Sequence, residues 1–181
     1  MRHSPIIGLL LLTMMVMAVP PVTAVRYLTK EEALNIAIPK AQSFQIEEIQ
    51  LTPNQQKRVQ DKVDEPIETD TFIFHVGKYN GQVDGYAYIT DKKGRHRPIT
   101  FIVGLKADCT VQDVAIMIYR EPRGYEVKEK RFLRQYRRKS IDDPIEVHRD
   151  IKNISGATIS AESVSAGVRE AVAICEEVFR P

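Results

Sequence analysis

The chain has 181 residues and a formal net charge of only +2, a balance that gives no reason to expect nucleic acid as a partner. Its two cysteines, Cys109 and Cys175, lack the CxxC-type spacing of haem c, zinc or thioredoxin-like sites. In an oxidising compartment they would form one disulfide, and two buried free thiols are the alternative.

The first 24 residues are typical of a secretory signal peptide. Arg2 and His3 precede an apolar run at residues 6–19, and residues 22–24 fit a small-x-small cleavage site. The run is shorter than the ~20 residues that span a bilayer, although an uncleaved anchor is the alternative. We therefore expect an exported protein in the periplasm or another extracytoplasmic space, either free or associated with the membrane.

Residues 25–69 contain two helix-start signals. Thr29 and Glu32 form a capping box ahead of an apolar stripe. Pro53 begins a second, mostly polar helix that we expect to lie on the surface. Residues 44–51 between them predict a short extended segment. The sequence thus indicates an N-terminal helical element that packs on a sheet or serves as a docking surface.

From residue 71 the hydrophobic period changes to two, which predicts β-strands. Four strands are expected, at residues 72–76, 85–89, 98–105 and 111–119. Short turns separate them, one of them at residues 91–94, so the pairing should be antiparallel. The histidines His75, His96 and His148 show no metal-ligating spacing, and we assign no metal site.

Seven Lys and Arg residues lie between residues 128 and 139. Phe132, Leu133 and Tyr136 would share one face of a helix there and leave the positive charges outward. A solvated amphipathic helix is the simplest interpretation. A docking patch for an acidic redox partner or for anionic lipid headgroups is the functional alternative.

A turn rich in hydroxyl groups opens a C-terminal amphipathic helix. Its residues are Ser155, Gly156, Ala157, Thr158, Ile159 and Ser160. Free backbone N–H groups and the helix dipole make such a turn a favourable anion site, and a plain helix cap is the alternative. Gly156 and Ala157 would let a bulky group approach the backbone and the Thr158 hydroxyl.

Residues 154–160 resemble the flavinylation motif of the FMN-binding domain family. That family includes the FMN-carrying subunits of sodium-pumping NADH:quinone oxidoreductase and of membrane ferredoxin:NAD oxidoreductase. In it, the second Thr or Ser of the motif carries FMN through a phosphoester bond, which implies Thr158 here. One departure is that Lys152 stands where the family usually has Asp, with Asp150 two residues earlier.

A second segment resembles the same family. The family has a Glu-Thr-Pro-Gly-like turn that lines the flavin site, and Glu121 and Gly124 match it after the fourth predicted strand, although the Thr is replaced and the Pro is shifted. The resemblance implies an FMN-binding domain at residues 70–181. The residues it implies at FMN are Thr158 as the covalent attachment point, with Ser155, Gly156, Ala157, Ile159, Ser160, Glu121, Gly124 and Tyr125.

The expected fold is α+β: an antiparallel sheet with packed helices, in which the C-terminal helix starts at the cofactor turn. The resemblance implies an exported electron carrier, without catalytic residues of its own, that exchanges electrons with membrane or periplasmic redox proteins. A flavin transferase would take FMN from FAD and release AMP. One alternative is a non-flavinylated interaction or sensing domain, favoured by Lys152. Another is a flavin-dependent reductase with Glu121 or Tyr125 as acid/base group.

Overall fold

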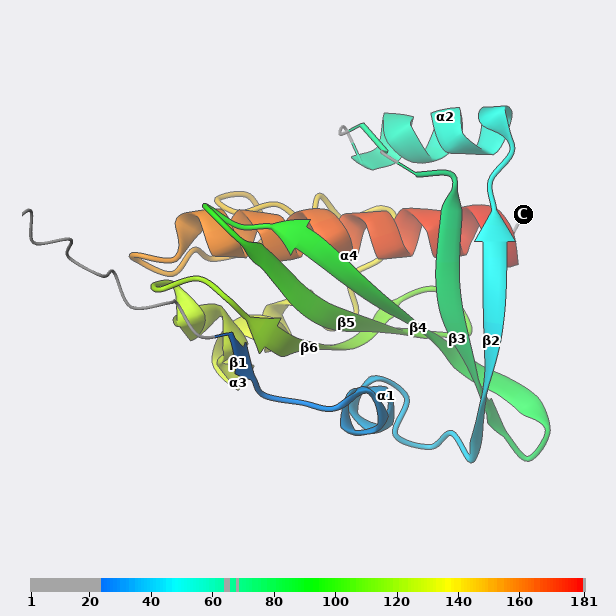
Figure 1. Cartoon of the computed structure of the whole chain (residues 1–181). Coiled ribbons are helices and arrows are strands. Elements are labelled where there is room, and N and C mark those ends of the chain that lie inside the picture. Colours follow the sequence, from blue (N-terminus) through cyan, green and yellow to red (C-terminus); the bar gives the residue numbers. More distant parts are fainter. Residues whose placement is uncertain (1–23, 64–65, 68, 181) are drawn as a thin grey trace, which may run out of the picture.

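The computed structural model describes residues 24–63, 66–67 and 69–180, so the expected signal peptide lies almost wholly outside the described residues. The fold is α+β, as predicted (Figure 1). One six-stranded antiparallel sheet has the order β1-β6-β5-β4-β3-β2. Among the described residues, no helix combines the length and apolar character needed to cross a membrane.

The four predicted strands are all present, the extended segment expected at residues 44–51 forms a fifth, and one further strand of two residues comes from the start of the N-terminal element. The strands are β1 (Val25–Arg26), β2 (Ser43–Gln50), β3 (Thr71–Tyr79), β4 (Gln82–Lys93), β5 (Pro98–Lys106) and β6 (Val111–Tyr119). β2 pairs with β3 along its whole length, and β1 pairs with the end of β6. Residues 25–69 therefore build both edges of the sheet as well as contributing helices.

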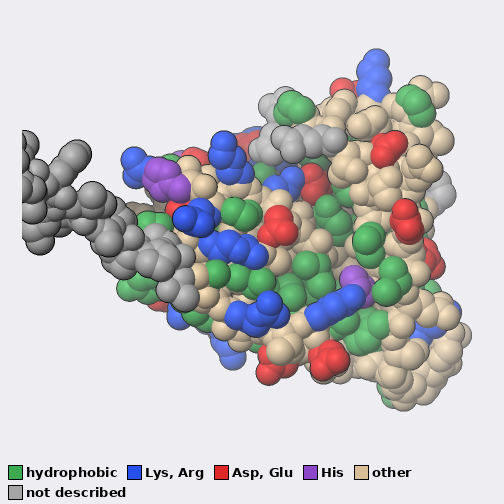
Figure 2. Space-filling model, viewed as in Figure 1, with side chains coloured by type: hydrophobic (Ala, Val, Ile, Leu, Met, Phe, Trp, Pro, Cys, Tyr) green, Lys and Arg blue, Asp and Glu red, His purple; other side chains and the backbone are tan. Residues whose placement is uncertain are grey.

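Helices cover both faces of the sheet. They are α1 (Lys30–Ala37), α2 (Pro53–Val63), the 3-10 helix η1 (Tyr125–Lys128), α3 (Lys130–Leu133), the 3-10 helix η2 (Arg134–Tyr136) and α4 (Thr158–Phe179). The main core lies between α4 and one face, and a smaller core lies between α1 and the other. Figure 2 shows apolar and basic side chains lying close together on one side of the molecule.

The N-terminal helices begin as predicted. The Thr29–Glu32 capping box is formed in full at the start of α1. The expectation that α2 lies on the surface is confirmed for most of its residues, while Val59 and Val63 are buried where α2 packs against α4. An ion pair between Arg58 and Glu177 joins the same two helices.

The turn predicted at residues 91–94 is wrong, because β4 continues to Lys93. Asp91 pairs in register with Thr100 and accepts a hydrogen bond from its hydroxyl. Lys92 forms an ion pair with the buried Glu170 of α4. These contacts hold polar residues in a strand, so the turn moves to residues 94–97.

The basic segment does not form one continuous helix. It is divided into η1, α3 and η2, and Glu129, whose backbone is extended (φ −65°, ψ 132°), separates η1 from α3. The predicted apolar face is confirmed: Phe132, Leu133 and Tyr136 are buried.

Cys109 and Cys175 form a disulfide, which settles the question that the sequence leaves open. Cys109 lies in the β5–β6 turn and Cys175 in α4, and both side chains are fully buried. The bond ties the far end of α4 to the sheet.

Candidate flavin site

The turn before α4 leaves the helix N-terminus open. Gly156 has a left-handed backbone (φ +82°), and a Cβ there would meet nothing within 4 Å. Ala157 is the N-cap and provides no side-chain hydrogen bond. The hydroxyl groups of the turn therefore do not cap the helix, and the N–H groups of its first turn are left for another acceptor.

Thr158 is the first residue of α4 and is half-buried. Asn153 fixes its side chain, since the Asn153 amide nitrogen donates to Thr158 Oγ1 at 2.7 Å. The amide oxygen of Asn153 in turn accepts from the backbone N–H of Ile154 at 2.8 Å. The Thr158 hydroxyl keeps its own proton for another partner.

The Glu121–Gly124 turn packs directly behind this helix start. The Tyr119 hydroxyl donates to the Arg123 carbonyl at 2.6 Å, so the Ser160 hydroxyl donates to Tyr119 Oη at 2.8 Å. Burial raises the pKa of Tyr119, with the Ser160 hydrogen bond acting in the opposite direction, so the phenol stays protonated. Gly124 has φ +83°, and a Cβ there would lie 3.0 Å from Ser160 Oγ. Only glycine allows this approach.

Glu121 holds the β4–β5 turn. Its buried carboxylate accepts hydrogen bonds from the backbone N–H groups of His96 (2.5 Å) and Arg97 (2.8 Å). Gly94 leaves room for this contact, because a Cβ there would lie 2.7 Å from Glu121 Oε1. The carboxylate thus places the tip of the turn, with Arg95 and His96, beside α4.

These three segments enclose a pocket of about 700 Å³, within the roughly 300–1,000 Å³ typical of small-molecule sites. Its lining residues are Arg95, His96, Glu121, Pro122, Arg123, Gly156, Ala157, Thr158, Ile159 and Ser160. Two arginines, Arg95 and Arg123, and an uncapped helix N-terminus line one space. Such a site favours a phosphate-bearing ligand.

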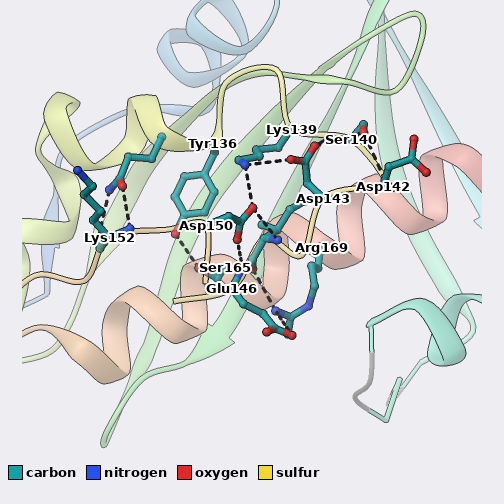
Figure 3. A network of polar contacts seen from close by, with 12 residues as sticks. Tyr136, Lys139, Ser140, Asp142, Asp143, Glu146, Asp150, Lys152, Ser165 and Arg169 are labelled. Atoms are coloured by element: carbon teal, nitrogen blue, oxygen red, sulfur yellow. Dashed lines mark hydrogen bonds and ion pairs between the residues drawn. The ribbon is translucent and has the colours of Figure 1, made fainter. Parts of the chain in front are cut away.

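A polar network holds the segment before the turn against α4 (Figure 3). Lys139 forms ion pairs with both Asp143 (2.9 Å) and Asp150 (2.8 Å). Asp150 also accepts hydrogen bonds from the backbone N–H groups of Ile145 and Glu146. Burial raises the pKa of Asp150, but Lys139 and these N–H groups outweigh it and leave the pKa below its ordinary value.

The same network includes Lys152, which stands where the family usually has Asp, and Asp150, two residues earlier. The Asp150 carboxylate is occupied by Lys139 and the backbone, and does not reach Thr158. Lys152 is exposed, and its backbone is bound on both sides by the Gln135 amide. The side chain that contacts Thr158 is Asn153, for which the sequence gave no signal beyond its place near the motif.

Most of the predicted site residues meet in one place. Gly156, Ala157, Thr158, Ile159, Ser160 and Glu121 line the pocket, and Gly124 packs behind it. Ser155 is exposed next to the pocket, and Tyr125 is exposed on η1, outside it. Arg95 and His96 were missed, because the sequence placed the β4–β5 turn too early. Pro122 and Arg123 were missed because, in the turn after β6, only Glu121 and Gly124 match the family.

A comparison with protein-family models agrees with this geometry: residues 94–173 match the model of the FMN-binding domain. This part of the chain is similar to the FMN-binding domain family. The match starts at Gly94 in the β4–β5 turn and ends within α4, so it includes every pocket-lining segment. FMN is the cofactor, and the open helix start with two pocket-lining arginines fits its phosphate. No curated protein matches the chain.

Proposed function

We propose that the protein is an exported electron carrier whose FMN is joined by a phosphoester to Thr158. One observation carries the proposal: the Thr158 hydroxyl lies at an uncapped helix N-terminus, inside a pocket with Arg95 and Arg123. An attached phosphate keeps one negative charge, which these groups stabilise.

Attachment follows from simple chemistry. The Thr158 oxygen bonds to the FMN phosphorus of FAD, the pyrophosphate bond breaks, AMP leaves, and the hydroxyl proton passes to solvent or to the flavin transferase. Thr158 is then an anchor and not a catalyst. When bound, FMN supplies the electron-transfer chemistry, and the protein orients and tunes it.

Export has two lines of support. The first residues are typical of a signal peptide, and a disulfide persists in oxidising compartments. We infer that electrons pass between this protein and membrane or periplasmic redox proteins. A reductase with its own acid/base group is less well supported, because Glu121 is engaged by backbone N–H groups and Tyr125 lies outside the pocket.

The test is flavin fluorescence on a denaturing gel, with protein exported in a host that has a periplasmic flavin transferase. Wild type and Thr158→Ser should give fluorescent bands, and Thr158→Val a dark one. Ser155→Ala is the matched control, because its hydroxyl belongs to the same turn but lies outside the pocket. A dark wild-type band despite a working transferase would contradict covalent attachment.

The second candidate is a domain of the same fold without covalent flavin. It is favoured by Lys152 at the usual Asp position and by the engagement of Asp150 with Lys139. In that case denaturation and filtration should remove any flavin absorbance from the wild-type protein. The native Thr158→Val variant should show the same flavin absorbance as native wild type.

A further inference from the structure

A groove separate from the flavin pocket lies along the edge of the sheet at β6. It has a volume of about 600 Å³. Its floor is residues 113–116 of β6. One wall comes from α1 and from Pro39, two residues after its end, and the other from residues 128–137. The groove therefore lies where β6 would accept another strand.

The outer edge of β6 forms backbone hydrogen bonds at its two ends. β1 pairs with Ile118 and Tyr119, and the Tyr27 backbone N–H donates to the Met117 carbonyl. At the other end Val111 exchanges backbone hydrogen bonds with residues 138 and 139. In the described part of the chain, no strand adjoins residues 112–116 on that side. These five residues span roughly 17 Å of open edge, where backbone groups can pair with an added strand.

The two walls differ in chemistry. The α1 side presents Ile36, which is 38% exposed, and Pro39. The opposite wall presents four cations, Lys128, Lys130, Arg134 and Arg137. The carboxylate within the groove, Asp113, is already paired with Arg137 at 2.5 Å, which leaves a positive surplus.

We propose that this groove binds an extended acidic segment of a partner protein as an additional strand on β6. Side chains alternate across a strand, so one set would meet the apolar wall and the other the cations. The segment that fits both walls alternates apolar and acidic residues. Binding by strand addition takes its affinity from the backbone and its specificity from such alternate side chains.

The groove adjoins the flavin site through the chain itself. The segment from Tyr119 to Lys128 lines the flavin pocket with Glu121 and Arg123 and the groove with Lys128. A partner seated in the groove would therefore contact the segment that also lines the flavin pocket. The inference that this partner is a redox protein rests on the proposed function. The inference that the groove binds an acidic strand is independent of it.

The probe is a labelled eight-residue peptide of alternating Glu and Val, titrated into the full flavin-loaded protein. We expect saturable binding, weakened roughly tenfold or more by Lys130→Glu with Arg134→Glu. Arg131→Glu with Arg138→Glu is the matched control, since it makes the same charge change in the same segment outside the groove. A peptide with four Glu followed by four Val should bind clearly more weakly, although its charge and composition are the same.

Amide hydrogen exchange provides the second measurement. Bound peptide should slow exchange within residues 112–116 and leave the edge strand β2 unchanged. Equal weakening by both double variants, equal binding of both peptides, or unchanged exchange at β6 would overturn the proposal. Vesicles of phosphatidylglycerol that bind the protein and displace the peptide, with both double variants affected alike, would instead identify a membrane-facing basic surface. Peptide binding does not depend on the flavin bond. Failure of the electron-carrier proposal would be detected by the denaturing-gel test and would leave the peptide result unchanged.

Discussion

Thr158 depends for its position on a neighbour that no motif identifies. Asn153 donates to its hydroxyl oxygen from five residues upstream, while Asp150 and Lys152 are engaged elsewhere. The Asn153 amide group, as a donor to Thr158 Oγ1, fixes the threonine side chain but does not accept the hydroxyl proton. In the attachment we propose, the group that removes this proton would therefore belong to solvent or to the transferase, as expected if Thr158 is an anchor.

Gly124 allows a first prediction at the scale of single residues. Gly124→Ala should destabilise the protein by about 2–4 kcal/mol and reduce its FMN content, because a left-handed alanine is strained and its Cβ would lie 2.9 Å from Tyr119 Oη and 3.0 Å from Ser160 Oγ. Chemical denaturation and flavin-to-protein absorbance measure the two effects.

Gly81→Ala is the matched control for that substitution. Gly81 has nearly the same backbone (φ +79°), but a Cβ there would meet nothing within 4 Å. It should cost only the backbone strain of about 1–2 kcal/mol and leave FMN content unchanged. Equal effects of the two substitutions would mean that the close packing behind the flavin pocket does not matter.

At the scale of elements, the loop between η2 and α4 is held by charge and not by regular structure. Lys139 links Asp143 and Asp150, and the Tyr136 hydroxyl is hydrogen-bonded to Ser165 of α4 at 2.9 Å (Figure 3). The turn at residues 155–160, called the flavin turn below, follows this loop directly. The network therefore sets where α4 begins. Its strength should therefore depend on the ionisation of the two aspartates.

The second prediction concerns pH. Burial raises the pKa values of Asp143 and Asp150, but ion pairs and N–H groups leave both below the ordinary value. Their stabilisation is therefore present above about pH 4, the unfolded-state pKa, and is lost as pH falls through the lower folded-state values. Asp150→Asn should lower the free energy of unfolding by about 1–3 kcal/mol at pH 7.

The difference in the free energy of unfolding between Asp150→Asn and wild type should decrease as the pH is lowered from 7 towards 3. Urea denaturation of both proteins at each pH measures it. Asp142→Asn is the control in the same loop, since Asp142 is exposed and lies outside the Lys139 ion pairs. A difference between Asp150→Asn and wild type that stays constant with pH would show that the charge of Asp150 contributes nothing.

At the scale of the whole molecule, the sequence predicted what is local. Alternating apolar residues predicted the four central strands, the Thr29 capping box predicted α1, and helical spacing predicted α4. The extended segment expected at residues 44–51 is confirmed as β2, but its place at the sheet edge was not predicted, because β2 is mostly exposed and has no clear hydrophobic period. β1 was missed because it has only two residues.

The missed parts of the candidate site depend on contacts between distant residues. Glu121 binds the β4–β5 turn from 24 and 25 residues away and so brings Arg95 to the pocket. The length of β4 depends on Glu170 of α4, which is 78 residues from its partner Lys92. Local patterns contain no information on such pairs, whereas the motif at Thr158 is continuous in sequence and was recognisable.

The disulfide acts on this same long-range organisation. It joins residues 66 apart in sequence, and the loop it closes contains the Glu121–Gly124 turn and the whole flavin turn. In the chain-entropy model, closing a loop of this length stabilises the folded state by about 4 kcal/mol. The bond is therefore expected to matter most for the part of the chain that forms the flavin pocket.

The last prediction is that replacing both Cys109 and Cys175 by Ala lowers the free energy of unfolding by about 2–5 kcal/mol, measured by urea denaturation of the purified, oxidised protein. Both sulfur atoms are buried, so a reductant should act on wild type only as it unfolds. Denaturation with reductant present should therefore bring wild type to the stability of the double variant and leave the variant unchanged. A wild-type curve that reductant does not shift would mean that the bond contributes nothing to stability, and that the flavin site is held by packing alone.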